Sequence, residues 1–501
     1  MKVSDLFSPW ESLQTPPFLI EESPPENPDI TGIQYNSRKV QPGDLFVAVP
    51  GLVADGHTFA PVAAKNGAVF LVAERPVPEA GLPTIIVNDS RRALAALSAA
   101  FYQFPAEDLT LIGITGTNGK STTAHILEEI LRRAGHTTGV MGTIDWHYPG
   151  HSESVSTTTP ESRDLQARLA AMRDAGVTHV VMEVSSHAID LGRIAHTPFD
   201  VAVFTNLSQD HLDYHSNMGT YWACKQSFLE GVLGGHFGKK EASLVINIDD
   251  ERGEQLLNHC IAKTGGNRLF STGRHPDALI RPGSPRFSLS GIRCSLMTPE
   301  ETIPVACPLV GAFNLENMLG ATAAALALGI KPQTIKEALE SSLAVPGRLE
   351  PVPDPKGRHI FVDYAHTPDA LEKALTALRK CSRGRLIVLF GCGGDRDRTK
   401  RPVMARIAAD TADFCVITSD NPRKEDPDSI IQDILHGIPE GTLLAVEKDR
   451  EKAIFQAIAM AEPGDVLLIA GKGHETYQIV GDTIHPFDDR AVAAKGVIAH
   501  A

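Results

Sequence analysis

The chain has 501 residues, which is too long for one ordinary hydrophobic core and predicts about three domains. Hydrophobic residues make up 42% and charged residues 22%, and no apolar run is long enough to cross a bilayer, which argues against a membrane protein. The formal net charge of -14 disfavours a nucleic-acid-binding surface, because such surfaces need clustered Lys and Arg.

The N-terminal region predicts a small α/β domain in residues 1–104. Its first five residues lack the apolar core of a secretory signal, so we expect a cytoplasmic protein. Short β-rich runs with turn residues, such as residues 43–51, precede an Ala-rich helix near residues 91–101. The seven cysteines of the whole chain form no CxxC pair, so we expect reduced thiols and neither disulfides nor a zinc site.

A central domain is predicted in residues 105–344. After a polar break, residues 109–115 read as a buried strand and residues 122–134 as an amphipathic helix. Further strands are predicted at 179–184, 200–205 and 243–248, residues 268–308 are β-like, and an Ala-rich helix covers 314–328. This alternation favours a mostly parallel sheet flanked by helices.

A Pro-Gly pair at residues 346–347 marks the second boundary, so the C-terminal domain is predicted in residues 345–501. Strands are predicted at 359–364, 385–390, 414–418 and 466–470, with helices between them. The predicted fold class is therefore α/β with three domains: a central P-loop ATPase-like parallel sheet and a C-terminal Rossmann-like doubly wound domain follow the N-terminal one.

The sequence Gly-Thr-Asn-Gly-Lys-Ser at residues 116–121 predicts a phosphate-binding loop. It lies between a strand and a helix, where backbone N–H groups and the positive charge of Lys120 point at an anion. The strict P-loop pattern has a glycine where this chain has Ile114, with Gly113 one step earlier, so the loop is a variant. Ser121 falls where a hydroxyl meets Mg²⁺. The alternative is a glycine-rich turn with a solvated lysine.

Polar side chains follow the next two predicted strands. Glu183 ends one strand, and His211 lies in the Asp210-His211-Leu212-Asp213 run after the other. Strand C-termini in open α/β sheets face the ligand crevice, so both side chains are predicted to meet the same phosphates. The alternative interpretation makes them cap or turn residues.

Four motifs together resemble the Mur ligases, the cytoplasmic amide ligases of peptidoglycan precursor synthesis: residues 115–121, 210–213, 311–317 and 363–366. The resemblance covers essentially the whole chain, including residues 35–38 and 43–46. It implies a three-domain monomer. Within the family, Asp420-Asn421-Pro422-Arg423 resembles the members that add meso-2,6-diaminopimelate to UDP-N-acetylmuramoyl-L-alanyl-D-glutamate with ATP, through an acyl phosphate.

The resemblance also implies roles for individual residues. ATP would be bound by Gly116, Thr117, Asn118, Gly119, Lys120, Ser121, Thr122, Asn314, Arg348 and Asp363. Catalytic roles fall to Lys120, Glu183, His211 and Lys225, and Mg²⁺ would be held by Ser121, Glu183, His211 and a carbamylated Lys225. Without the resemblance, Lys225 would be interpreted as an ordinary surface helix residue. Because Arg348 and Asp363 lie beyond the second boundary, the C-terminal domain would have to close over ATP.

Two further sites follow from the same resemblance. The UDP-muramoyl dipeptide would contact Ser37, Thr158, Thr159, Ser185 and Arg193, while Leu191 stands where the family commonly has glutamine. Diaminopimelate would contact Arg396, Asp420, Asn421, Pro422, Arg423, Gly471 and Glu475. Diaminopimelate has one carboxylate more than lysine, and the planar guanidinium of Arg binds a carboxylate through two parallel bonds. Glu475 can pair with an ammonium group.

Three alternatives stay open at this point. A lysine-adding ligase of the same family would lack the carboxylate receptor at Arg423. A folylpolyglutamate synthetase-like ligase has no obvious place for residues 35–51 and 420–423. A P-loop switch protein, whose nucleotide state controls a partner, would retain nucleotide tightly and form no amide.

Overall fold

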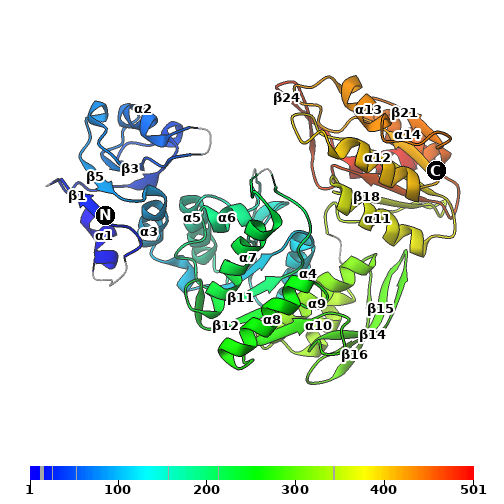
Figure 1. The fold of residues 1–501 in the computed structure, drawn as a ribbon, viewed down its shortest axis with the longest axis horizontal. Helices are drawn as coiled ribbons and strands as arrows, with labels where there is room; N and C mark the ends of the chain where they lie inside the picture. Colours follow the sequence, from blue (N-terminus) through cyan, green and yellow to red (C-terminus); the bar gives the residue numbers. More distant parts are fainter. Residues whose placement is uncertain are drawn as a thin grey trace.

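The computed structural model describes residues 1–11, 16–24, 26–51, 54–155, 157–212, 214–341 and 345–500. Figure 1 shows three α/β regions that follow one another along the chain, each built on its own sheet. The predicted three-domain α/β fold is confirmed. Asp213 and the predicted boundary at residue 344 lie outside the described residues. Among the helices that the structure describes, none has the length and apolar character needed to cross a membrane.

The N-terminal region is a five-stranded sheet in the order β1-β5-β4-β3-β2, with only β1 antiparallel to its neighbour. Its core lies between the sheet and helices α1 and α3, where leucine and alanine side chains of α3 are fully buried. The strands are β1 (Ile20–Glu22), β2 (Gly32–Gln34), β3 (Asp44–Val47), β4 (Phe70–Ala73) and β5 (Thr84–Val87), and the helices are α1 (Val3–Glu11), α2 (Ala60–Lys65), α3 (Ser90–Phe101) and the 3-10 turns η1 (Ser37–Lys39), η2 (Gly56–Phe59), η3 (Pro78–Ala80) and η4 (Pro105–Glu107).

The central region contains an eight-stranded sheet in the order β13-β12-β11-β6-β10-β7-β8-β9, in which neighbouring strands are parallel except in the pairs β7–β8 and β8–β9. Its strands are β6 (Thr110–Thr115), β7 (Thr138–Met141), β8 (Asp145–Tyr148), β9 (His151–Ser154), β10 (His179–Glu183), β11 (Phe199–Phe204), β12 (Gly238–Asn247) and β13 (Leu269–Thr272). The β-like stretch predicted at 268–308 supplies β13 and a separate antiparallel sheet of β14 (Arg281–Ser288), β15 (Gly291–Met297) and β16 (Thr302–Cys307).

Helices cover the central sheet: α4 (Lys120–Arg133), α5 (Ser162–Asp174), α6 (Ser186–Asp190), α7 (Met218–Leu233), α8 (Glu251–Thr264), α9 (Ala312–Ala327) and α10 (Pro332–Leu339). One core joins apolar residues of α4 and α9, such as Ile126 and Leu319. Gly113, one residue from the P-loop position, is a strand residue, and a Cβ there would lie 2.8 Å from Phe199 and from Phe228. This glycine lets two aromatic rings pack against β6, so it serves packing and not the loop.

The C-terminal region has a six-stranded sheet in the order β17-β18-β22-β19-β20-β21, with β17 antiparallel at the edge. Neighbouring residues of one strand enter different cores, Phe361 with α11 to α13 and Ile360 with α14 and α15, so helices cover both faces as predicted. The elements are β17 (Glu350–Val352), β18 (His359–Asp363), α11 (Pro368–Cys381), β19 (Leu386–Phe390), α12 (Lys400–Thr411), β20 (Phe414–Ile417), α13 (Pro427–Leu435), β21 (Leu444–Val446), α14 (Arg450–Met460), β22 (Val466–Ala470), the hairpin β23 (Tyr477–Val480) and β24 (Thr483–Pro486), and α15 (Asp489–Ala499).

Candidate active site

Three neighbouring strands of the central sheet bring the predicted phosphate site together. β6 lies between β11 and β10, and all three run in parallel, so the chain leaves them at one edge of the sheet. β6 leads into the loop 116–121, β10 ends with Glu183, and β11 leads into the segment that contains His211. The segments that the sequence predicts to face one crevice therefore emerge side by side.

The phosphate loop needs glycine where it crosses the end of β11. Gly116 has φ +144° and Gly119 has φ +86°, conformations that L side chains rarely adopt. A Cβ on Gly116 would lie only 1.9 Å from Thr205 Oγ1. The Thr117 N–H donates to the Asn206 carbonyl at 2.8 Å, so the loop and the end of β11 are fastened together.

Two lysines meet at one carbonyl of this loop. The ammonium of Lys120 donates to the carbonyls of Gly116 and Thr117 at 3.1 and 2.8 Å, and Lys225 Nζ donates to the same Gly116 carbonyl at 3.1 Å. Burial, followed by the charge of Lys120, holds the pKa of Lys225 well below its usual value. Lys225 is only 1% exposed, so its interpretation as a surface helix residue is wrong. A neutral buried amine is a nucleophile, which a solvated ammonium is not.

Tyr221, for which no role was predicted, lies between the phosphate loop and two of the predicted Mg²⁺ ligands, Lys225 and His211. Its hydroxyl lies 3.2 Å from Thr117 Oγ1, and Lys225 Nζ lies 4.7 Å from the centre of its ring. The imidazole of His211 lies edge-on to the same ring, with the ring centres 6.1 Å apart. Tyr221 and Lys225 are one helical turn apart on α7, so a single helix face positions both.

The buried carboxylate of Glu183 joins the phosphate loop to the predicted muramoyl-peptide residues. It accepts hydrogen bonds from Ser121 Oγ at 2.8 Å and from the backbone and hydroxyl of Thr143 at 2.8 and 3.0 Å. The Thr143 hydroxyl lies 3.0 Å from that of Thr158. Thr143 follows β7, and only the strand order, which sequence does not give, brings it here.

Three further predicted residues surround the end of β10. The Thr159 hydroxyl donates to the Glu183 carbonyl at 2.8 Å and accepts from the Ser185 N–H at 3.1 Å. Arg193 Nη1 donates to the Thr159 carbonyl at 3.1 Å. Ser37 lies in η1 of the N-terminal domain, where its carbonyl accepts from Asn66. The structure therefore groups Thr158, Thr159, Ser185 and Arg193 within the central domain and places Ser37 in another domain.

The predicted residues that complete the nucleotide site differ in what they touch. Arg348 reaches the loop directly, since its Nη2 lies 3.3 Å from Ser121 Oγ. Asp363 accepts the backbone N–H groups of Leu349 and Ala365 at 2.7 and 2.8 Å, so it shapes the segment that carries Arg348. Burial raises the pKa of Asp363 against the lowering effect of Arg348.

Asn314 contacts the loop through a neighbour. Its side chain donates to the Val310 carbonyl at 2.7 Å and accepts from Asn317 at 3.0 Å. Asn317 is the residue against the loop, because a Cβ on Gly119 would lie 2.1 Å from Asn317 Oδ1. Asn314 thus orients Asn317, which the motif 311–317 contains but for which the sequence assigned no role.

A second contact ties the C-terminal domain to the phosphate loop. Asp369, in the first turn of α11, accepts hydrogen bonds from Asn118 Nδ2 at 2.8 Å and from Ser208 Oγ at 3.2 Å. Asp369 had no predicted role, although it follows the motif 363–366 closely. With Arg348, it places the C-terminal domain against the loop.

The predicted amino-acid site lies at one edge of the C-terminal sheet. β18, β22, β19 and β20 are parallel neighbours, and the chain leaving the last three carries all the predicted diaminopimelate residues. Asn421 Nδ2 donates to Glu475 Oε2 at 2.8 Å, and the fully buried Lys472 bridges both, at 3.0 Å to Glu475 and 3.2 Å to Asn421. A Cβ on Gly471 would lie 2.7 Å from Asp420 Oδ2, so these loops are in close contact.

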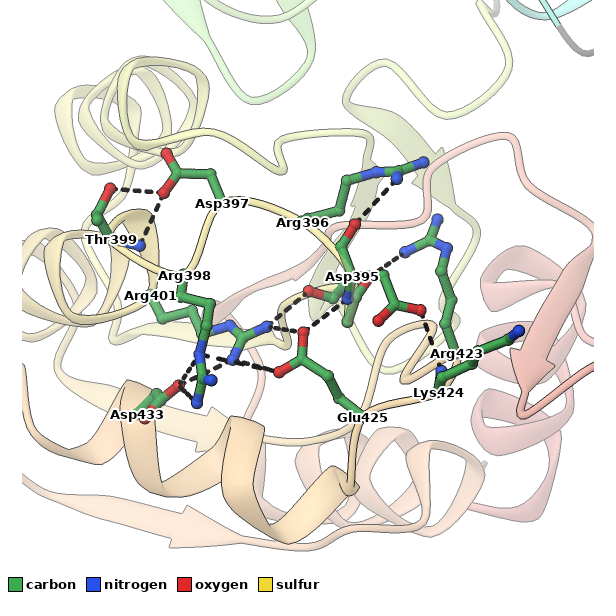
Figure 2. Close-up of polar contacts among 12 residues, drawn as sticks. Asp395, Arg396, Asp397, Arg398, Thr399, Arg401, Arg423, Lys424, Glu425 and Asp433 are labelled. Carbon is green, nitrogen blue, oxygen red and sulfur yellow. Dashed lines mark hydrogen bonds and ion pairs between the residues drawn. The ribbon is translucent and has the colours of Figure 1, made fainter. Parts of the chain in front are cut away.

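The two predicted arginines both lie against Gly393. A Cβ on Gly393 would lie 2.8 Å from Arg423 Nη1 and 3.8 Å from Arg396 Cγ. Burial raises the pKa of Tyr477, against the lowering effect of the charges of Arg423 and Arg396. Figure 2 shows both side chains and the bond of Arg423 Nη1 to the Gly394 carbonyl, at 2.9 Å. Arg423 has φ +52°, and the hairpin β23–β24 holds its backbone through bonds from its N–H to Ile479 and to its carbonyl from Gly481.

In the part of the chain that the structure describes, no group of three or more His, Cys, Asp or Glu side chains is arranged to hold a metal. Ser121 and Glu183 nevertheless place a hydroxyl and a carboxylate 2.8 Å apart beside the phosphate loop. Oxygen ligands of this kind suit Mg²⁺, which takes few ligands from a protein and the rest from phosphate and water.

The fold and the site define a three-domain α/β protein built around a phosphate-binding loop, with a Rossmann-like domain placed against that loop. Three family models match it in chain order: "Mur ligase family, catalytic domain" over residues 29–102, "Mur ligase middle domain" over 114–325 and "Mur ligase, glutamate ligase domain" over 347–473.

Relatives match over nearly the whole chain. A Geobacillus thermodenitrificans protein named UDP-N-acetylmuramoyl-L-alanyl-D-glutamate--2,6-diaminopimelate ligase is 46% identical over 473 residues, covering 94% of this chain and 95% of the relative. A protein of the same name from Synechococcus elongatus is 47% identical over 476 residues, covering 93% of each. A solved structure of a ligase with this name is 31% identical with a TM-score of 0.70, covering 98% of both chains. The chain belongs to the Mur ligase family.

Proposed function

We propose that the chain is an ATP-dependent amide ligase that adds meso-2,6-diaminopimelate to UDP-N-acetylmuramoyl-L-alanyl-D-glutamate in peptidoglycan precursor synthesis. The observation that carries this proposal is the full-length identity of 46% and 47% to ligases of that name. The arrangement of Arg396 and Arg423 on neighbouring loops at one edge of the C-terminal sheet supports the choice of amino acid, because the distal carboxylate needs a guanidinium receptor.

The reaction divides between the two halves of the site. The D-glutamate γ-carboxylate attacks the terminal phosphorus of ATP, forming an acyl phosphate and releasing ADP. The amine of diaminopimelate then attacks the acyl carbon, and phosphate leaves. We propose that Lys120, Arg348 and the N-terminus of α4, which meet at the phosphate loop, neutralise charge on the transferring phosphoryl group, which is the main catalytic demand of such transfers. The C-terminal domain positions the amine.

We further propose that Ser121 and Glu183 hold Mg²⁺, together with His211 and a carbamylated Lys225. When bound, the ion supplies positive charge to the phosphate oxygens. The burial of Lys225 supports the carbamylation, because a neutral amine can attack CO₂ and the product is an anion. Thr158, Thr159, Ser185, Arg193 and Ser37 are the proposed contacts of the UDP-muramoyl dipeptide.

The remaining expectations stand as proposals on the same basis. The domain boundaries are kept at 1–104, 105–344 and 345–501, and a monomer in the cytoplasm, where ATP and the nucleotide-sugar peptide are available, remains the prediction. Leu191, at the usual glutamine position, is the C-cap residue after α6 and changes one expected contact to the peptide substrate.

An amino-acid assay tests the proposal. Purified protein receives ATP, UDP-N-acetylmuramoyl-L-alanyl-D-glutamate and either meso-diaminopimelate or L-lysine, and amide product and ADP are measured. Wild type should use diaminopimelate. Arg423→Ala should lose roughly 10- to 100-fold in kcat/KM for diaminopimelate, the worth of a charge-assisted pair, and far less for lysine. Arg406→Ala, an exposed arginine of α12 paired with Asp410, is the matched control.

Each other outcome has a definite meaning. Preference of the wild type for lysine would replace the proposal by the lysine-adding alternative. Turnover only with a folate would indicate the folylpolyglutamate synthetase-like ligase. Tight nucleotide retention without amide product would favour the P-loop switch protein. Equal losses for both amino acids in Arg423→Ala would mean that Arg423 is structural.

A further inference from the structure

A buried arginine lies beneath the proposed amino-acid site. Arg401, in the first turn of α12, has a side chain that is 0% exposed. Its guanidinium donates two hydrogen bonds to the carboxylate of Glu425, from Nη1 to Oε2 at 3.0 Å and from Nη2 to Oε1 at 2.9 Å. It also donates to Asp433 at 2.8 Å and to the Gly393 carbonyl at 3.2 Å (Figure 2). One side chain thus contacts three separate parts of the C-terminal domain.

Two of these parts are the segments that carry the proposed receptor arginines. We call residues 391–398, with Arg396, and residues 420–425, with Arg423, the two arginine loops. Glu425 belongs to one loop and also accepts the Asp395 N–H of the other at 2.6 Å. Asp395 in turn accepts the Lys424 N–H at 3.2 Å. Arg401 and Glu425 therefore fasten the loops to each other and to α12.

The two arginine loops are in close contact at two glycines. A Cβ on Gly394 would lie 1.9 Å from the Pro422 carbonyl oxygen, and one on Gly393 would lie 2.8 Å from Arg423 Nη1. Asp395 and Arg423 have φ +51° and +52°, the left-handed region that non-glycine residues rarely occupy. Backbone in this region persists only where surrounding contacts hold it, and the Arg401 cluster supplies such contacts to both loops.

The charges of the cluster leave the receptor arginines available. Arg401 and Arg398 lie 2.8 and 3.0 Å from Asp433, and bonds from both hold the pKa of that carboxyl below its usual range. The pKa of Glu425 is lowered first by its bond to Arg401. Both carboxylates thus pair with Arg398 and Arg401. In the described residues no ion pair joins Arg396 or Arg423 to a carboxylate of the protein, so their guanidinium groups are available for a ligand carboxylate.

We propose that Arg401 is a positioning residue for amino-acid recognition: by binding Glu425 and the Gly393 carbonyl together, it fixes the distance between Arg396 and Arg423. The inference rests on the proposed diaminopimelate site. A buried ion pair adds little stability over a well-packed apolar pair, so its contribution here is geometric. When a recognition group is displaced by about an ångström, the efficiency with which the enzyme uses that substrate falls by roughly 10- to 100-fold.

The test compares two buried arginines of the same domain. Arg401→Lys keeps the positive charge but cannot form the two parallel hydrogen bonds to Glu425. Its matched control is Arg358→Lys, because Arg358 is 3% exposed, grips Asp354 at 2.6 and 2.9 Å and donates to the Ile458 carbonyl, away from both loops. We expect Arg401→Lys to raise KM for diaminopimelate by roughly 10- to 100-fold, with KM for ATP and for the nucleotide-sugar peptide changed less than about twofold. Arg358→Lys should lower Tm without changing KM for diaminopimelate.

Two more variants keep the proposal decidable. If Arg401→Lys does not fold, Glu425→Gln, which keeps size and removes the charge, should raise the same KM. Arg423→Ala separates the two proposals: an unchanged KM for diaminopimelate in that variant means that the amino-acid site itself is misplaced. A raised KM in Arg423→Ala, with values near wild type in Arg401→Lys or Glu425→Gln, overturns the positioning role alone. An equal rise in Arg401→Lys and Arg358→Lys reduces it to general stability.

Discussion

Replacing Gly116 by alanine should damage the phosphate loop more than the same change at Gly135. Both glycines have positive φ, +144° and +90°, so both variants carry backbone strain of about 1–3 kcal/mol. A methyl group on Gly135 would meet nothing within 4 Å, whereas one on Gly116 would lie 1.9 Å from Thr205 Oγ1 and 3.0 Å from the backbone nitrogen and oxygen of Asn206. Overpacking of this kind costs a further ~1–3 kcal/mol.

That excess corresponds to a roughly 5- to 150-fold weaker binding of ATP, if the nucleotide-free loop of Gly116→Ala relaxes and must return to its present shape to hold phosphate. Isothermal titration with a non-hydrolysable ATP analogue measures the affinity. Any strain that the nucleotide-free protein does not relax should appear as a lower unfolding temperature. The reasoning is refuted if Gly116→Ala and Gly135→Ala bind the analogue equally and unfold at the same temperature.

Three other predictions follow from named contacts. Lys225→Arg should lose roughly 100-fold or more in ligase activity, because a permanent cation replaces the proposed anion, and intact-mass measurement in CO₂-rich buffer should find one added CO₂ on wild type only; an unmodified, equally active pair would contradict this. Burial alone would lower the pKa of His147, but its bonds to Asp145 and Glu128 raise it to about 10, so its stabilisation is full below about 6.5 and is lost as the pH rises through about 10. Across that window the free energy of unfolding should fall by about 1–3 kcal/mol more in wild type than in His147→Gln, and parallel urea-denaturation curves would refute the assignment. Asp369→Ala should loosen the C-terminal domain from the phosphate loop and increase the radius of gyration in small-angle scattering, whereas Asp410→Ala on the exposed face of α12 should not.

Local pattern was enough for most of the strands that matter. Residues 466–470 form β22 with the predicted bounds, and the predicted strand at 109–115 is β6, one residue shorter at its start. β22 is a continuous apolar run, and β6 has an apolar centre at residues 111–114 between two threonines, as expected of strands in a sheet covered on both faces. The hairpins β8–β9 and β23–β24 were missed because each of their strands has only four residues, of which Trp146 is the one that is buried, so neither hairpin has the buried apolar run that predicts a strand.

The site was less accessible from sequence, because its residues meet through strand order and helix packing. Thr143 and Arg401 have no local signal, since each acts through a partner far along the chain. Lys225 did have one. It shares the face of α7 with the buried Tyr221, Phe228 and Val232, at helical spacing, so periodicity alone could have predicted its burial. A lysine on an apolar stripe indicates a perturbed amine, and that inference was available without any resemblance.

At Arg423 the side chain proposed for substrate recognition is one that disfavours the left-handed backbone conformation found there. Asparagine tolerates φ near +52° far better than arginine does, so Arg423→Asn should relieve strain of about 1–2 kcal/mol while deleting the guanidinium proposed to read the distal carboxylate. Selection or engineering for thermal stability alone would therefore drive this position away from arginine. An enzyme improved in that way would be more robust and would discriminate less well between its amino-acid substrate and lysine.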